Sequence, residues 1–243
     1  MVGGVTRLAV CAALAGSVSC ASLPSSTKEE TFSRKYAHFA YAEVETVRQT
    51  TPKSCGLAVL ACVLRYWEKP ATEPELVAQF PVVTGRGHSL QRLREIAQER
   101  GLLAFAVSMN GPAGTPAAQL SEQISKGRPV IAAVHCPEGR YFGDPVPVLG
   151  TLDARTWRPF GIVPSSTGSA FKHHYVVVFG EDRERYLLMD PAYGIVSVAK
   201  PSLLAWWKDE GYSALICSPA PVPAAPSAAS PAPLSSASSP PHP

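Results

Sequence analysis

Charged side chains are scarce in this 243-residue chain, at 17% of the sequence, and they are almost missing from its two ends. Residues 1–27 hold one charged residue, Arg7, and residues 218–243 hold none. The 190 residues between these ends hold 40 charged residues, which approaches the roughly 25% typical of globular proteins. The scarcity of charge therefore excludes both ends from the globular part, and it predicts a leader, a body at residues 36–217 and a tail.

The sequence features of several protein classes are missing from the body. It contains no apolar run long enough to span a bilayer, no glycine-rich phosphate loop and no internal repeat. These absences exclude a membrane-spanning domain, a nucleotide-hydrolysing domain and a repeat architecture. The net charge of +3 gives no electrostatic reason to propose a nucleic acid partner. Nothing in the sequence indicates a cofactor.

The leader has the pattern of an export signal. One basic residue, Arg7, precedes a short apolar run over residues 8–16, and small residues follow up to Cys20. A short apolar segment behind a positive charge is typical of a secretory signal peptide, and this run is too short to cross a bilayer of about 30 Å as a helix. We therefore expect residues 1–19 to be a signal peptide.

The residues around Cys20 resemble a bacterial lipoprotein cleavage site. The resemblance implies cleavage before Cys20, lipidation of its sulfur, and a tether over residues 20–35. Ala21 is not the residue that retains lipoproteins in an inner membrane, so the expected location is the bacterial cell envelope, on the outer membrane facing the periplasm. The alternatives are an exported protein cut near Ala21 and an uncleaved anchor.

The tail, residues 218–243, holds nine prolines. Such a segment cannot bury enough apolar surface to offset the entropy lost on ordering, so we expect it to be disordered. It could bind a partner, act as a spacer, or be inert.

Hydrophobic periodicity divides the body into helices followed by strands. A run that is apolar nearly all round, Cys55–Trp67, predicts a buried central helix, and the segment Tyr36–Val47 is either an edge strand or an approach to the body. Further helices are predicted at Glu73–Phe80, Ser89–Arg100, Ala117–Ser125 and Pro201–Lys208, and strands at Leu102–Val107, Val130–Val134, Tyr175–Phe179, Tyr186–Met189, Ile195–Val198 and Ser213–Ile216. This order indicates an α+β domain, with a helical lobe packed on an antiparallel sheet. The segment Cys136–Lys172 is unusually long for a loop and could be a lid, a hairpin insertion or a flap.

Cys55 lies in the first turn of the predicted central helix. Unpaired backbone N–H groups and the positive end of the helix dipole favour a thiolate there, which is one route to a cysteine nucleophile. Cys62, seven residues later, has no polar neighbours in the sequence and is interpreted as core.

His174 and Asp190 are the candidate base and orienting carboxylate. If Gly180 pairs with Glu184 around a three-residue loop, His174 lies opposite Asp190 on the same face of the sheet. A carboxylate there would orient the imidazole and stabilise its charged form. His173 is a rival base, but it has the opposite parity on the strand.

Gln49, six residues before Cys55, is a candidate oxyanion donor, because its amide N–H and the backbone N–H of Cys55 could stabilise the same negative charge.

Taken together, the sequences around Gln49, Cys55, His174 and Asp190 resemble those of a known family. The string Gln49-Thr-Thr-Pro-Lys-Ser-Cys55-Gly56 is similar to the Gln-x5-Cys-Gly opening of the bacteriocin-processing, double-glycine leader peptidases, which are cysteine peptidases of papain-like fold. The resemblance continues at Gly127-Arg128-Pro129, His174-Tyr175-Val176-Val177 and Asp190-Pro191, and it spans residues 49–200.

The resemblance implies Cys55 as nucleophile, His174 as base, Asp190 as orienter and Gln49 as oxyanion donor, with cleavage after paired glycines. The chain departs from the family at Ser54, where Asp is usual, and in the long segment 136–172. It also lacks the family's fused membrane and ATPase domains, which suggests a free-standing version with a possible export-system partner. We expect a cysteine endopeptidase acting on a peptide or protein, with glycine-rich sequences as one class of substrate. The alternatives are a non-cleaving peptide-binding module of a secretion or assembly system, and an acyl transferase using the same residues.

The remaining histidines and cysteines indicate neither a metal site nor a disulfide. His88, His135 and Cys136 do not have the spacing of a standard zinc site. The sequence does not define a pairing among Cys62, Cys136 and Cys217, and we expect none, because a free Cys55 would have to avoid disulfide exchange.

Overall fold

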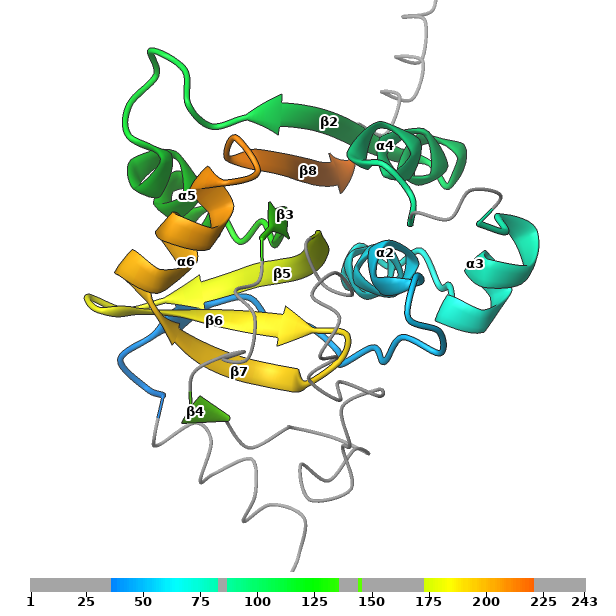
Figure 1. The fold of residues 1–243 in the computed structure, drawn as a ribbon, viewed down its shortest axis with the longest axis horizontal. Coiled ribbons are helices and arrows are strands. Elements are labelled where there is room, and N and C mark those ends of the chain that lie inside the picture. Colours follow the sequence, from blue (N-terminus) through cyan, green and yellow to red (C-terminus); the bar gives the residue numbers. More distant parts are fainter. Residues whose placement is uncertain (1–35, 83–86, 136–143, 146–172, 221–243) are drawn as a thin grey trace, which may run out of the picture.

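The computed structural model describes residues 36–82, 87–135, 144–145 and 173–220, and its framework is one antiparallel sheet. The strands are β1 (Ala40–Tyr41), β2 (Leu102–Ser108), β3 (Val130–Val134), β4 (Asp144–Pro145), β5 (His174–Glu181), β6 (Arg185–Asp190), β7 (Gly194–Ala199) and β8 (Ser213–Pro219). They pair in the order β2-β8-β3-β5-β6-β7-β4, and β1 adds to β5 (Figure 1). The predicted strands are therefore confirmed, although only two residues of the segment Tyr36–Val47 form a strand.

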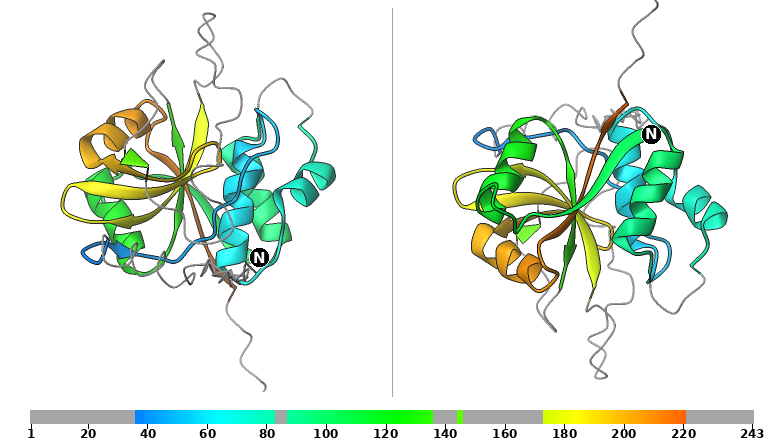
Figure 2. Two further views of the ribbon diagram at one scale, coloured as in Figure 1. Left: turned by 90° about the horizontal axis from the view of Figure 1, so that it is seen from below. Right: turned by 90° about the horizontal axis from the view of Figure 1, so that it is seen from above.

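Helices cover both faces of this sheet. The helices α2 (Cys55–Tyr66), α3 (Glu73–Gln79) and α4 (Leu90–Glu99) lie on one side, and α5 (Pro116–Ser125) and α6 (Lys200–Lys208) lie on the other (Figure 2). Strand β5 shows why both faces are apolar: Val177 and Phe179 belong to the core under α2, whereas Val176 and Val178 belong to the core under α5 and α6. The α+β class and the buried central helix are as predicted. The second helical layer was not predicted.

The helix boundaries follow from local capping. The side chain of Ser89 accepts a hydrogen bond from Arg92 N at the start of α4, and Gly101, with φ of +80°, follows its end. Thr115 caps α5 in the same way. Helix α2 is buried from Cys55 to Leu64, which agrees with its uniformly apolar sequence. None of the helices within the described residues is long and apolar enough to cross a membrane.

The predicted register of the β5–β6 hairpin is wrong. Val177 pairs with Met189 and Val178 with Leu188. The same register places Asp190 opposite Val176, two positions from His174, and not opposite His174 as expected from the sequence. The reason lies in the turn, because Asp182 Oδ1 accepts hydrogen bonds from Glu184 N and Arg185 N, at 2.8 and 2.6 Å. This arrangement lengthens the loop, and a bulge between Val178 and Gly180 adds a further residue to β5.

The C-terminal limit of the body also differs from the prediction. Strand β8 continues to Pro219, because Ser218 pairs with Leu103 and Pro219 with Leu102 of β2. The body therefore extends two residues beyond Cys217.

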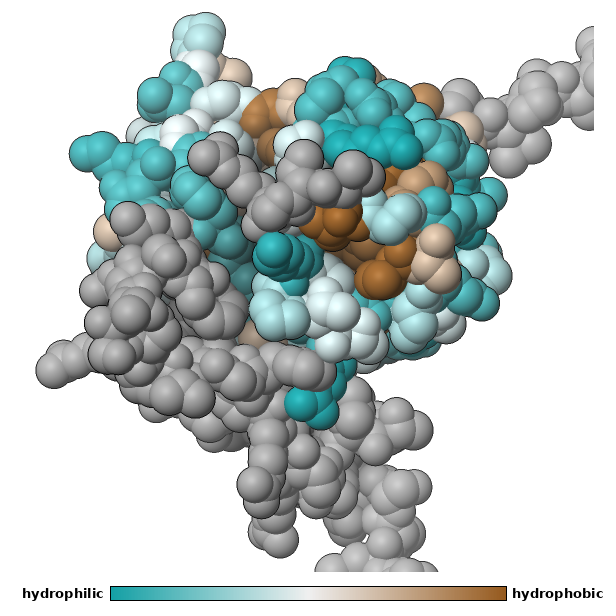
Figure 3. Space-filling model, turned by 45° about the vertical axis from the view of Figure 1, so that its right-hand side comes forward, coloured by the Kyte–Doolittle hydropathy of each residue, from teal (hydrophilic) through white to brown (hydrophobic). Residues whose placement is uncertain are grey.

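The segment Cys136–Lys172 falls outside the described residues except for β4, which pairs with β7. On the side shown in Figure 3, apolar residues gather in the middle of a largely hydrophilic surface.

Candidate active site

The first turn of α2 presents Cys55. Ser54 precedes the helix, and its Oγ both donates to Thr51 O and accepts from Thr51 N, each at 3.1 Å, so the chain turns sharply before the helix begins. Cys55 is the first helical residue and is 8% exposed. The backbone N–H groups of a first helical turn have no partners within the helix. The structure therefore places a thiol where the polypeptide can stabilise negative charge.

His174 and Asp190 are in contact despite the altered register. His174 Nε2 lies 3.0 Å from Asp190 Oδ2, and the two side chains are 3% and 0% exposed. A register shift of two residues preserves the side-chain alternation of a strand, so the two residues become diagonal neighbours rather than opposite ones. Asp190 therefore reaches His174 along the diagonal of the sheet.

The carboxylate of Asp190 is held in a fixed orientation. Its second oxygen, Oδ1, accepts hydrogen bonds from Ala192 N at 2.7 Å and from Tyr193 N at 3.0 Å. These bonds close the β6–β7 turn, in which Gly194 adopts a φ of +90° that favours glycine. Because Oδ1 is held by backbone amides, Oδ2 is directed to His174. The geometry of this turn thus accounts for the first and last residues of the Asp190-Pro-Ala-Tyr-Gly194 sequence.

His174 interacts with both Asp190 and Cys55. Burial lowers the pKa of His174, but the charge and hydrogen bond of Asp190, together with the hydrogen bond and charge of Cys55, outweigh burial and raise this pKa to about 10. Asp190 Oδ2 contacts Nε2, which leaves Nδ1 as the ring nitrogen available to the Cys55 side chain. The three residues therefore form a continuous chain of contacts from thiol to imidazole to carboxylate.

Gln49 is fully buried in the segment that leads to Cys55. Its backbone N–H donates to Pro191 O at 2.9 Å, which ties it to the residue after Asp190. Its Nε2 donates one hydrogen to Thr51 O at 2.9 Å, and an amide nitrogen carries a second hydrogen. The structure thus places Gln49 beside the loop of the candidate nucleophile.

Two other cysteines serve as references for Cys55. Cys55, Cys62 and Cys217 are the free cysteines among the described residues. Burial raises the pKa of Cys62 well above its usual range, with a smaller contribution from Glu45, and burial raises the pKa of Cys217 to about 12. Neither has a histidine partner in the described contacts comparable to that of Cys55. Cys62 is a core residue, as expected.

His173 does not join the candidate triad. Its Nδ1 lies 2.6 Å from Glu210 Oε1, and its side chain is 75% exposed. His135 lies on the other side of the same carboxylate, whereas His88 is not part of this group.

The sequence model of the Peptidase_C39 like family matches residues 41–214, a range that contains all four candidate residues. The chain belongs to this family. A comparison with curated protein sequences finds no match.

The fold of the Peptidase_C39 like protein is also that of solved peptidase domains. It is similar to the peptidase domain of Streptococcus ComA, a bifunctional ABC transporter involved in quorum sensing, with a TM-score of 0.50 and 17% identity over 73% of this chain and 100% of that domain. It is also similar to a double glycine motif protease from an AMS/PCAT transporter in complex with its leader peptide, with a TM-score of 0.49 and 20% identity over 74% and 94% of the two chains. The similarity to the ComA peptidase domain confirms the predicted papain-like α+β fold.

Glu73, at the start of α3, is a site residue that sequence reasoning missed. It is 1% exposed, and its Oε1 accepts hydrogen bonds from Thr50 N at 2.9 Å and Thr50 Oγ1 at 3.0 Å. Thr50 directly follows Gln49, so Glu73 fixes the loop on which the candidate oxyanion donor lies. In the sequence, Glu73-Pro-Glu75 is an ordinary acidic helix start, and nothing there distinguishes the buried carboxylate.

The second residue of the Cys-Gly pair, Gly56, lies where a side chain would be too close to its neighbours. A Cβ atom on Gly56 would lie 3.1 Å from Leu93 Cδ1 and 3.3 Å from Tyr175 Cδ2. These distances are shorter than ordinary van der Waals contact, so glycine lets α2 approach α4 and β5 closely. This close approach places the start of α2 against the start of β5, where His174 lies.

Proposed function

We propose that this chain is a cysteine endopeptidase with Cys55 as nucleophile, His174 as base and acid, and Asp190 as orienter. The observation that carries the proposal is the buried chain of contacts that joins Cys55 to His174 and His174 to Asp190. Membership of the Peptidase_C39 like family supports it. Such a chain of contacts is the geometry of nucleophilic catalysis by a cysteine.

The residues divide the reaction into two steps. The thiolate of Cys55 attacks the scissile carbonyl, and the negative oxygen is stabilised by the backbone N–H of Cys55 and an amide hydrogen of Gln49. His174, held protonated by Asp190, gives its proton to the leaving amine, and a thioester forms. His174 then takes a proton from water, the water attacks the thioester, and the acid and free Cys55 are released.

The proposed substrates are peptides cleaved after paired glycines, as in the family that the sequence resembles. A narrow substrate groove can admit glycine and exclude residues with larger side chains. We therefore expect cleavage of a peptide that contains Gly-Gly, and no cleavage of the same peptide with Ala-Val at those positions. Mass spectrometry of the products after incubation with the purified full chain checks this. Equal cleavage of both peptides would contradict the double-glycine specificity but would be consistent with peptidase activity. Cleavage of neither would contradict the peptidase itself.

The proposed location is the bacterial cell envelope, with the protein anchored through a lipid on Cys20 and facing the periplasm. The support is the sequence of the leader, which lies outside the described residues. We expect radiolabelled palmitate to be incorporated into the wild-type protein in cells and not into Cys20→Ala, with the variant moving to the soluble fraction. Equal incorporation into both proteins would contradict lipidation of Cys20.

A further inference from the structure

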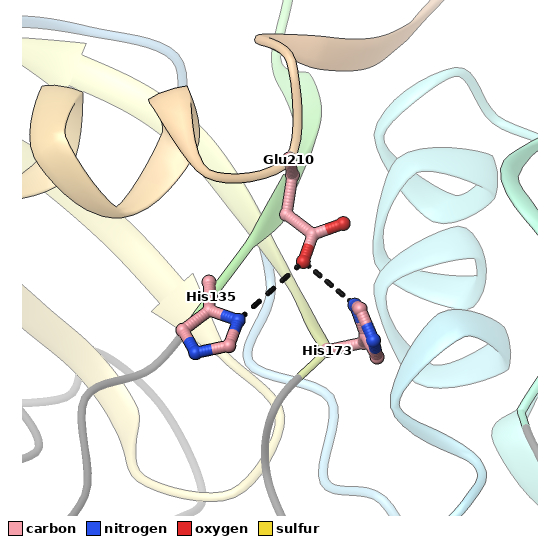
Figure 4. Close-up of side chains that lie close together, drawn as sticks. All are labelled: His135, His173 and Glu210. Carbon is pink, nitrogen blue, oxygen red and sulfur yellow. Dashed lines mark hydrogen bonds and ion pairs between the residues drawn. The ribbon is translucent and has the colours of Figure 1, made fainter.

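Two histidines and a glutamate outside the candidate triad come together at one end of the sheet, where β3 stops and β5 starts. His135, His173 and Glu210 each offer one ligand atom, and these atoms all lie within 4.8 Å of one another. Glu210 Oε1 is 2.6 Å from His173 Nδ1 and 3.8 Å from His135 Nδ1. Figure 4 shows the two imidazole rings approaching the same carboxylate from two sides. We propose that these three residues form a binding site for a divalent transition-metal ion, and that the ion is Zn²⁺.

The pairing of β3 with β5 fixes the two histidines. Val134 and His174 are opposite each other in the antiparallel ladder, so the same register continued by one position places His135 opposite His173. Opposite residues in such a ladder have Cβ atoms about 4.5–5.5 Å apart. The backbone of His135 is also held by a hydrogen bond from its N–H to Trp206 O, at 2.9 Å. The two imidazoles are therefore brought together by the sheet itself.

A third element supplies the carboxylate. Glu210 lies in the turn between α6 and β8, where its N–H donates to Trp207 O at 3.1 Å and its carbonyl accepts from Ser213 N at 3.2 Å. Trp207 is fully buried, and its indole N–H donates to Ser213 O at 2.9 Å. The turn is thus attached to the core. Glu210 is 18% exposed, so its carboxylate is held in place while it faces the histidines.

The donor set and its dimensions suit zinc. Two neutral imidazoles and one carboxylate are the protein ligands of many three-ligand zinc sites, in which a fourth position is left to water. Zinc–ligand bonds of 2.0–2.2 Å place tetrahedral ligand atoms about 3.3 Å apart, so the donors need only small side-chain rotations to bind an ion. The His135 and His173 side chains are 35% and 75% exposed, which leaves the site open to solvent.

The position of the site gives the ion a structural consequence. His135 and His173 border residues 136–172 in the sequence, so an ion bound to both would join the two ends of that segment. His173 also directly precedes His174. Bound zinc would therefore stabilise the β3–β5 end of the sheet beside the candidate active site, because a ligand that binds only the folded state raises its stability.

Zinc titration of the metal-stripped full chain, followed by calorimetry, tests this proposal. We expect one Zn²⁺ per chain, at least tenfold weaker binding in His173→Ala and in Glu210→Gln, and a melting temperature raised by about 5 °C or more when zinc is in 100-fold excess over its Kd. His38→Ala is the matched control, because His38 is another exposed histidine paired with a carboxylate, that of Asp182. It should bind zinc as the wild type does.

A second variant separates this site from the candidate active site. Cys55→Ala should keep the full zinc affinity, and the Co²⁺ complex of the wild type should show no thiolate charge-transfer band. Zinc binding that survives His173→Ala and Glu210→Gln, that is lost in Cys55→Ala, or that is missing from the wild type would overturn the proposal. None of these measurements depends on peptidase activity, so the proposal stands or fails independently of the proposed function.

Discussion

Replacement of Cys55 by alanine is expected to reduce peptide cleavage to the background level, a loss of about 10⁵-fold or more in kcat. The residue that forms the covalent intermediate has no substitute, because the thioester cannot form without the Cys55 sulfur. The purified Cys55→Ala chain should fold normally, since the change removes a single sulfur atom at the first position of α2 and alanine is well tolerated in a helix. Cleavage of a Gly-Gly peptide, followed by mass spectrometry, measures the loss.

Cys62→Ala is the control for this experiment. Cys62 lies on the same helix, seven residues after Cys55, and is fully buried in the core. Its replacement should lower the melting temperature slightly and leave kcat unchanged. Alkylation of the native protein with iodoacetamide should modify Cys55 before Cys62 and Cys217, whose raised pKa values keep them as thiols. Cleavage retained by Cys55→Ala would exclude Cys55 as the nucleophile.

Replacement of Asp190 by asparagine is expected to lower kcat by about 10³-fold to 10⁴-fold. The amide oxygen can still accept the hydrogen bonds from Ala192 N and Tyr193 N, so the β6–β7 turn should remain closed. Its NH₂ group would then face His174 Nε2, and this contact selects the neutral imidazole with its proton on the nitrogen directed at Cys55. The variant therefore loses the charge that keeps His174 protonated while it preserves the shape of the site.

Asp182→Asn is a matched control for Asp190→Asn. Asp182 also closes a hairpin turn through Oδ1, and it also pairs with a histidine, His38, at 3.1 Å. It lies at the other end of β6 from Asp190. We expect kcat of Asp182→Asn to equal that of the wild type, and thermal unfolding should show similar small losses for both variants. A fall of less than about tenfold for Asp190→Asn would indicate that Asp190 has only a structural role.

The sequence was most informative where chemistry and local structure coincide. A helix start is recognisable from Pro52, Ser54 and the apolar run that follows, so the position of Cys55 could be derived without a fold. The strand β5 was also recognisable, because its apolar run is continuous and buried on both faces. The resemblance to a peptidase family then linked Gln49, Cys55, His174 and Asp190 before their distances were known.

The hairpin register was not predictable in the same way. The bulge between Val178 and Gly180 lies where another strand packs on β5: a Cβ atom on Gly180 would lie 2.5 Å from Tyr41 Cβ of β1. No local sequence pattern indicates that β1, a two-residue strand far away in the sequence, pairs with β5 at this position. His174 and Asp190 are in contact although the predicted register was wrong, because a shift of two residues keeps both side chains on the same face of the sheet.

The sequence by itself determined the helix start that carries Cys55, the strand that begins at His174, and the carboxylate at the end of the next strand. These are properties of neighbouring residues, and capping, periodicity and turn chemistry act locally. Only the tertiary structure decided that Glu73 holds the loop of Gln49 and that His135, His173 and Glu210 meet. These contacts join residues 23 or more positions apart, and packing of the sheet against its two helical layers is what brings them together.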